Sequence, residues 1–240
     1  MRKILIAILL LMAFSSFAFA KQFYASDFER DTIGKPPQGW EIGFKGNGNA
    51  QVIADPLNPR NKVFSHSDLA QDKSRHDVGG VMWVVGDANM TDYIVDYDAY
   101  FPTDFYMGTV FRFIDSEQFY LFDRRQGAPT FDFWKRLVGG WTNLVANGAF
   151  PAKPEKWFRF RIVVKGNTFD AYAKEKDDNT QFSKMKPLIT AQDATFKAGK
   201  FGLYGLIYVD NVVIGESEND LTIAVKPADK LAATWGNIKR

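Results

Sequence analysis

Apolar and polar residues alternate in short runs along this chain, which is the pattern of β-strands that are buried on one face. The clearest runs lie in residues 157–176, where a turn at Gly166-Asn167 pairs Val164 with Phe169 on the apolar side. The same alternation predicts strands at residues 51–54, 62–65, 81–85, 93–101, 200–206 and 208–214. No segment sustains the apolar spacing of a helix. We therefore expect an all-β chain of about a dozen strands in an antiparallel two-sheet sandwich.

Residues 108–124 predict two further strands around a turn at residues 115–118. Their period of two places one set of side chains toward the core, namely Phe111, Phe113, Tyr120 and Phe122. The opposite face then carries Arg112, Leu121 and Asp123. Arg112 and Asp123 are candidates for ligand contacts on that face.

Residues 131–147 predict a hairpin closed by Gly139-Gly140, and its two faces differ sharply in chemistry. One face carries Phe131, Phe133, Leu137, Leu144 and Ala146, and the other carries Asp132, Trp134, Arg136, Trp141 and Asn143. Indole rings stack on the C–H faces of pyranose rings, and Arg, Asn and Asp side chains bind hydroxyls. The second face, together with Arg112 and Asp123, predicts a saccharide-binding surface.

The alternative assignment reverses the faces and makes both tryptophans core residues. It would bury Arg136, Asn143 and Asp132 together, at a cost of about 1–3 kcal/mol for each group left unpaired. Lys135 favours the reversal, since our assignment places it on the apolar side. Both assignments remain open from the sequence, and the cost of burying three polar groups favours the first.

Composition narrows the classes of function. The chain has 30 basic and 28 acidic residues and a net charge of +2, a balance that argues against a nucleic-acid partner bound through phosphates. It contains no cysteine, which excludes thiol catalysis, cysteine zinc sites and iron–sulfur clusters. Aromatic residues make up 15% of the chain and include 22 Phe, which is consistent with a large aromatic core.

The first twenty residues have the three parts of a secretory signal. Arg2-Lys3 precedes the apolar run of residues 4–14, and small residues end at Ala20. Cleavage there would leave one domain at residues 21–215 and a C-terminal tail or extra strand at residues 216–240. We therefore expect a secreted or periplasmic protein with no membrane span after cleavage.

Several segments together resemble a known group of exported proteins. Residues 27–40 read DFERDTIGKPPQGW. Four shorter segments carry the rest of the resemblance, namely FRF at residues 111–113, FYLF at 119–122, GKFGL at 199–203 and VDNV at 209–212. In these segments the chain resembles LamG-like jelly rolls of the concanavalin A-like lectin/glucanase superfamily, in particular domains of the 3-keto-disaccharide hydrolase type. The resemblance covers residues 23–214. It implies a jelly-roll β-sandwich of about 12 to 14 strands, whose concave sheet binds carbohydrate and whose first and last strands pair.

The resemblance also implies a possible structural calcium ion. Pairing of the chain ends would bring Asp27 and Glu29 near Asp210, and carboxylate oxygens are the ligands that calcium prefers. The alternative is that these carboxylates only cap turns and strand edges. His66 and His76, with nearby aspartates, form a second conceivable metal site, for which a polar surface loop is the simpler explanation.

No catalytic motif is present. The Glu-x-Asp-x-x-Glu motif of related glucanases is absent, so a carboxylate pair would have to come from different strands, such as Asp123 with Asp132. The first interpretation is therefore an exported, lectin-like carbohydrate-binding protein. A sugar-active hydrolase or lyase of the 3-keto-disaccharide hydrolase type is the alternative, followed by a protein-interaction module of the cell envelope.

Overall fold

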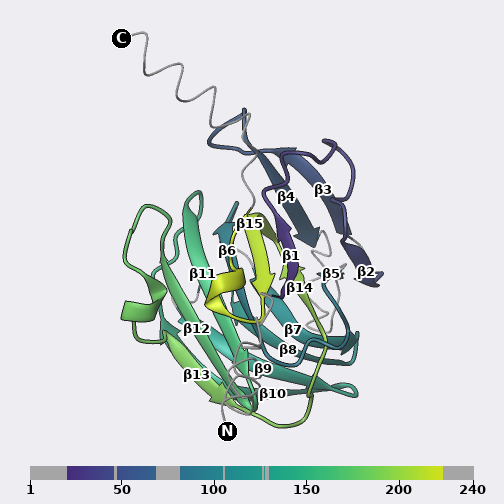
Figure 1. Ribbon diagram of the computed structural model, residues 1–240, viewed down its shortest axis with the longest axis vertical. Coiled ribbons are helices and arrows are strands. Elements are labelled where there is room, and N and C mark those ends of the chain that lie inside the picture. The colour runs from purple at the N-terminus through teal and green to yellow at the C-terminus, as the bar shows by residue number, and fades with distance from the viewer. Residues whose placement is uncertain are drawn as a thin grey trace, which may run out of the picture.

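The computed structural model describes residues 21–45, 48–68, 82–104, 106–125, 127 and 130–223. These residues form fifteen β-strands and two short 3-10 helices, η1 (Phe182–Lys184) and η2 (Glu218–Asp220), and none of them lies in an α-helix. The strands make two antiparallel sheets that pack face to face (Figure 1). The predicted all-β antiparallel sandwich is confirmed.

Sheet A has eight strands and includes both ends of the described chain. Its order is β13 (Ile189–Gln192), β12 (Thr168–Glu175), β11 (Trp157–Lys165), β6 (Tyr93–Tyr100), β15 (Ile207–Gly215), β4 (Lys62–Asp68) and β3 (Gly48–Ala54). The eighth strand, β1 (Gln22–Ser26), pairs with β15, so the predicted pairing of the first and last strands is confirmed. The register of β11 with β12 is also as predicted, with Val164 opposite Phe169.

Sheet B has seven strands and carries the candidate site. Its order is β10 (Gly140–Ala149), β9 (Thr130–Leu137), β8 (Gln118–Arg124), β7 (Met107–Asp115), β14 (Lys200–Gly205), β5 (Met82–Val85) and β2 (Glu41–Phe44). The sequence pattern missed β1, β2 and β13. Each is an edge or terminal strand of four or five residues, too short for alternation to be recognised.

Aromatic rings fill the space between the sheets, which explains the high Phe content. The ring of Phe122 on sheet B packs within 6.2 Å of Phe160 on sheet A, and the ring of Phe111 lies 5.0 Å from Phe169 in an edge-to-face contact. All four side chains are almost completely buried. This core fixes the inner face of sheet B, so residues at the alternate positions lie on its outer face.

The hairpin of β9 and β10 has the predicted faces, although its turn lies one residue earlier than expected. Trp141 pairs with Arg136, and the turn is made by Val138 and Gly139, both with positive φ. This change moves the pairing by two residues, and because side chains alternate with a period of two, the faces are unchanged. A bulge after Asn143 then alters the end of β10.

Beyond this bulge, the assignment of β10 side chains is partly wrong. Val145 packs against the core, whereas Ala146, which was predicted to face inward, is exposed. Leu144 packs against the core as predicted. The extra residue of the bulge reverses the alternation, and single-strand periodicity cannot reveal such an insertion.

Candidate functional site

The outer face of sheet B brings the hairpin residues together in rows that run across the strands. One row joins Tyr204, Gly108, Asp123 and Asp132, and the next joins Gly202, Val110, Leu121, Trp134 and Asn143. A third row joins Phe119, Arg136 and Trp141. Residues directly opposite one another in a ladder share a face, with Cβ atoms about 4.5–5.5 Å apart. The sheet therefore places six of the seven predicted ligand-binding residues on one surface.

An apolar cluster forms the floor of this surface. It consists of Met82, Val84, Val110, Phe113, Phe119 and Leu121, against which Phe44, Trp134, Trp141 and Tyr204 pack. It is separate from the core between the sheets. A sheet face with its own apolar floor and half-buried aromatic rings is typical of a binding surface rather than of an ordinary solvated face.

Each of the two indole rings packs against a guanidinium group. The Cζ atom of Arg125 lies 4.2 Å from the centre of the Trp134 ring, and Cζ of Arg136 lies 5.2 Å from that of Trp141. The Trp141 ring also makes an edge-to-face contact with Phe119 at 5.7 Å. Both tryptophans are half-buried, so the predicted outward assignment holds and the reversed assignment is wrong.

The indole N–H groups of these tryptophans are hydrogen-bond donors without an acceptor in the part of the chain that the structure describes. Among the described residues, Nε1 of Trp134 and Nε1 of Trp141 are buried and have no hydrogen-bond partner. Buried donors usually have one, and an unsatisfied donor costs about 1–3 kcal/mol. Unpartnered donors on a sheet face indicate a place where water or a ligand supplies the acceptor.

Arg125 and Arg136 differ in how their charge is balanced. Arg136 is buried and forms a two-point ion pair with Glu117, with Nε–Oε2 and Nη2–Oε1 distances of 3.0 and 3.2 Å. Those bonds, together with one from the backbone N–H of Gly139, hold the pKa of the Glu117 carboxyl below its usual value. Arg125 is exposed, and no carboxylate of the described residues lies within ion-pair distance of it. Arg136 therefore orients Trp141, whereas Arg125 offers a charge to a ligand.

Asp123 is the most perturbed titratable group on this face. It is 4% exposed, and burial raises its pKa to about 7, with Arg125 lowering the pKa and Asp132 raising it. The Trp134 indole also lowers the pKa of Asp123 slightly, but no hydrogen bond of normal geometry forms, and Oδ1 of Asp123 has no partner among the described residues. At neutral pH this carboxyl is therefore protonated much of the time and can donate a hydrogen bond.

Asp132, directly opposite Asp123 on β9, is held by donors instead. Its Oδ1 accepts a hydrogen bond from the backbone N–H of Asn147 at 3.1 Å, and its Oδ2 accepts one from Nδ2 of Asn143 at 3.5 Å. Asn143 is exposed, so its amide remains accessible to a ligand. The two aspartates thus present a carboxyl that can donate beside one that accepts.

Arg112 does not belong to this surface, so its predicted position was wrong. Its guanidinium points to the opposite side of sheet B, where Nη1 donates to the carbonyl of Phe196 at 2.9 Å and Nη2 to that of Thr91 at 2.8 Å. Arg112 has a φ of 45° and lies at a bulge in β7, which reverses the faces of the residues that follow. For the same reason Phe113, predicted to face the core, lies in the apolar floor of the outer face.

Lys135 lies on the inner side of sheet B, and its charge is paired there. Its side chain lies on the inner side as predicted, but its ammonium group reaches Oδ2 of Asp193 at 2.6 Å and Oγ1 of Thr195 at 2.9 Å. Tyr120 donates to the other oxygen of Asp193 at 2.6 Å. Burial alone would raise the pKa of Asp193, and the hydrogen bonds from Lys135, Thr195 and Tyr120 outweigh it and lower that pKa.

The predicted calcium ligands are not brought together. Glu29 accepts a hydrogen bond from the backbone N–H of Lys62 at 2.7 Å, and Asp27 accepts one from the backbone N–H of Glu29. Asp210 is bonded to Asn61 and to the backbone N–H of Asn211, and burial raises its pKa to about 6. Within the described parts of the chain, no group of three His, Cys, Asp or Glu side chains could hold a metal ion. The turn-capping alternative therefore agrees with these contacts.

Two further expectations concern residues that lie partly or wholly outside the described chain. His66 is buried and bonded through Nδ1 to the carbonyl of Gly205 at 2.7 Å, whereas His76 lies outside the described residues. Residues 1–20 and 224–240, which hold the predicted signal and most of the predicted tail, also lie outside them. Within the part that the structure describes, there is no helix of the length and apolarity needed to cross a bilayer.

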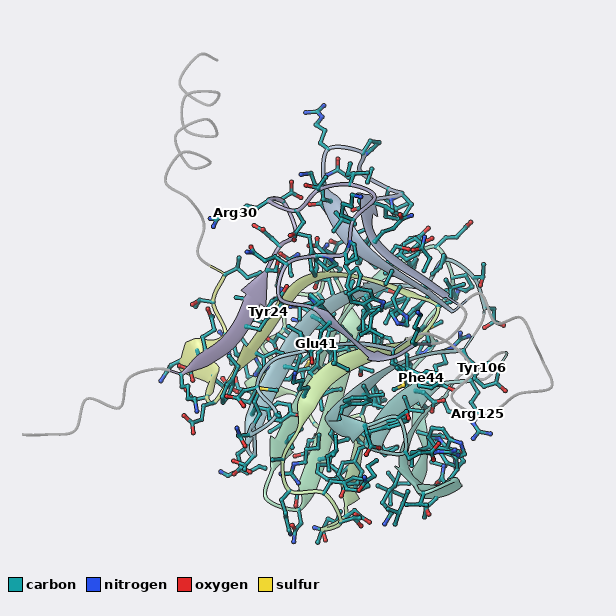
Figure 2. All side chains as sticks on the ribbon, turned by 90° about the vertical axis from the view of Figure 1, so that its right-hand side faces the viewer. Tyr24, Arg30, Glu41, Phe44, Tyr106 and Arg125 are labelled. Atoms are coloured by element: carbon teal, nitrogen blue, oxygen red, sulfur yellow. The ribbon has the colours of Figure 1, made fainter. Side chains whose placement is uncertain are left out.

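Sequence reasoning missed Arg125, although it sits beside the predicted residues. Figure 2 shows Arg125 in the same part of the molecule as Tyr106 and Phe44, well separated from Arg30. Arg125 lies just after the last residue of β8, where strand alternation no longer predicts the direction of a side chain. Its position two residues after Asp123, which would share a face with Asp123 if the strand continued, was the only signal that pointed to it.

Comparisons with known proteins show the fold. No family model matches the sequence, and no curated protein matches it. Carbohydrate binding module CBM66 from Bacillus subtilis has a similar structure, with a TM-score of 0.52 and 16% identity over 74% of this chain and 95% of the module. A protein of unknown function from Shewanella oneidensis MR-1 also has a TM-score of 0.52, with 11% identity over 92% of this chain and 96% of that one.

A third similar structure belongs to a larger protein. Xylan β-1,4-xylosidase from Bacillus halodurans C-125 has a TM-score of 0.52 and 11% identity, and the match covers 80% of this chain but 39% of the xylosidase. At such identities the likeness concerns architecture alone. Together with the sheet topology, these structures confirm the predicted fold, an antiparallel two-sheet jelly-roll β-sandwich.

Proposed function

We propose that this protein is an exported carbohydrate-binding protein whose ligand lies on the outer face of sheet B. The observation that carries the proposal is the placement of two half-buried tryptophans, Trp134 and Trp141, on one sheet face beside Asp132 and Asn143. Aromatic faces bind the C–H surfaces of sugar rings, and adjacent carboxylate and amide groups bind hydroxyls.

The contacts of each indole determine how a sugar would bind. Arg125 covers part of the Trp134 ring, so a sugar contacts a guanidinium–indole pair rather than a bare ring. Trp141 is fixed by Phe119 and Arg136, which reduces the side-chain freedom lost on binding. The unpartnered indole nitrogens then donate to ring or hydroxyl oxygens, which removes the cost of leaving them unsatisfied.

Two observations outside the site support the proposal. One of the similar structures is named as a carbohydrate binding module, and jelly rolls include lectin domains. Residues 1–20 have the pattern of a cleavable secretory signal, and export through it would bring the mature protein to the periplasm or outside the cell, where polysaccharides are accessible.

Binding to a glycan array and to insoluble polysaccharides tests the proposal. We expect the mature protein to bind at least one glycan, and we expect Trp134→Ala and Trp141→Ala to lose that binding while their urea unfolding remains cooperative. Trp157→Ala is the matched control, because Trp157 lies on sheet A and bonds to Asp55. A protein that binds no glycan, or whose binding survives both substitutions in sheet B, would contradict the proposal.

A sugar-cleaving activity is the second candidate, and a specific observation favours it. Asp123 and Asp132 are opposite each other on neighbouring strands, and Asp123 has a pKa near 7, as a general acid requires. Turnover of a saccharide that is lost in both Asp123→Asn and Asp132→Asn would establish this activity. Failure on plain and 3-keto glycosides alike would leave binding alone.

A further inference from the structure

The outer face of sheet B gathers hydrogen-bond donors around one point. These donors are the indole N–H of Trp134 on β9, the carboxyl of Asp123 near the end of β8 and the guanidinium of Arg125, which directly follows β8. Within the described chain, Nε1 of Trp134 and Oδ1 of Asp123 are buried without a partner, and Arg125 has no ion-pair partner. A ligand that satisfies all three must be rich in acceptors.

The positive charge of Arg125 indicates that the acceptor group on the ligand is anionic. Arg136, on the same face, is already neutralised by Glu117, so Arg125 supplies the positive charge that is left for a ligand. The guanidinium of Arg125 lies over the Trp134 ring, and guanidinium N–H groups form a fork whose geometry matches a planar carboxylate. A ligand made only of hydroxyl groups would leave this charge unbalanced.

Asp123 fits the same ligand because of its environment. Groups that face it are Arg125 at the end of its own strand, Asp132 on β9 and, across Gly108 of β7, the phenol of Tyr204 on β14. Burial outweighs these neighbours and keeps the carboxyl protonated for much of the time at neutral pH. A protonated carboxyl donates to an anionic oxygen, whereas an ionised one would repel it.

We propose that the saccharide bound on this face carries a carboxylate, as a hexuronic acid residue does, and that Arg125 and Asp123 bind that carboxylate together. The inference rests on the proposed carbohydrate-binding function and names the class of sugar. Arg125 supplies the two-point ion pair, Asp123 donates a hydrogen bond, and Trp134 lies beneath Arg125. Asp132 and Asn143 remain available for the hydroxyls of the same or the next sugar unit.

Matched pairs of ligands test the inference. Oligomers of glucuronate, galacturonate and mannuronate would each be titrated calorimetrically against the mature protein, alongside the same oligomer with its carboxyls reduced to alcohols. We expect at least one acidic oligomer to bind about tenfold or more tightly than its reduced form. Arg125→Gln should remove most of that preference, and Arg30→Gln, an exposed arginine in a distant part of the molecule, should retain it (Figure 2).

The pH dependence gives a second readout. Uronate carboxyls, like other carboxyls next to electron-withdrawing groups, titrate at about pH 3–4 and stay ionised above pH 5. Affinity of the wild type for the acidic oligomer should therefore rise several-fold from pH 8 to pH 5.5, as Asp123 gains its proton. Asp123→Asn, which is neutral at both pH values, should bind with little pH dependence.

The outcomes separate this inference from the proposed function. Binding of neutral or reduced oligomers as tightly as acidic ones would overturn the carboxylate preference and leave carbohydrate binding intact. Binding of sulfated but not carboxylated oligomers would also overturn it. Failure to bind any saccharide would overturn both proposals.

Discussion

Replacing Asp123 by Asn isolates the electrostatic state of the candidate site. The Asp123 side chain is almost fully buried, and its pKa rises from 3.8 in the unfolded chain to about 7 in the folded protein. A carboxyl whose pKa is raised by folding stabilises the fold while it is protonated, and this contribution is lost as the pH rises through the folded-state pKa. At pH 5 the folded state retains a proton that the unfolded state has mostly lost, and at pH 8 neither state holds it.

The size of the effect follows from the pKa. The folded-state pKa of about 7 lies about two units above pH 5, and each pKa unit corresponds to about 1.4 kcal/mol, so the contribution gained between pH 8 and pH 5 is about 2–3 kcal/mol. An amide does not titrate, so Asp123→Asn lacks this contribution at both pH values. The free energy of unfolding of the wild type, minus that of the variant, should therefore be about 2–3 kcal/mol larger at pH 5 than at pH 8.

Urea unfolding of both proteins at the two pH values measures this difference. Taking the difference removes the titration of all other groups, provided that both proteins unfold in two states with equal m-values. Equal differences at pH 5 and pH 8, within about 0.5 kcal/mol, would refute the claim that burial holds a proton on Asp123.

Three other substitutions test separate parts of the structure through urea unfolding at neutral pH. Val138→Asn should stabilise the protein by about 1 kcal/mol, because Val138 has a φ of 38° and is 77% exposed in a two-residue hairpin turn that favours Asn before Gly; a destabilised variant would contradict this backbone conformation. Gly108→Ala should destabilise the protein by about 1–3 kcal/mol, since the added Cβ would lie 2.7 Å from the carbonyl oxygen of Phe122. An unchanged urea midpoint would show that β7 and β8 are less closely packed. Asp193→Ala should destabilise the protein by about 2–4 kcal/mol by leaving Lys135 unpaired. Because the folded-state pKa of Asp193 is lowered, the wild type should lose this contribution only as the pH falls below about 4. A loss that begins near neutral pH would contradict this pairing.

Alternation along single strands predicted most of the fold because a two-sheet sandwich buries one face of each strand. The hairpin of β11 and β12 was predicted residue by residue, since neither strand contains a bulge and Gly166 marks the turn. The faces of β9 were predicted correctly even though the turn was displaced, because a shift of two residues preserves them.

The errors arose at bulges, where one inserted residue reverses the alternation. Arg112 adopts a positive φ within β7, turns inward and binds the carbonyls of Thr91 and Phe196, which are distant in sequence. Such carbonyl acceptors come from tertiary packing and leave no periodic signal along the strand. The role of Arg125 was missed for a related reason, because only the fold shows that its guanidinium lies over Trp134.

The proposed function requires that Trp134 and Trp141 contact a saccharide on the outer face of sheet B. Its most direct test is an NMR titration that follows the indole Nε1–H resonances of the protein, assigned by single Trp→Phe substitutions, while a glycan that binds is added. We expect saturable shifts of the Trp134 and Trp141 resonances with a common dissociation constant, and little change for Trp40 and Trp157. Saturable shifts confined to Trp40 or Trp157, with those of Trp134 and Trp141 unmoved, would contradict it.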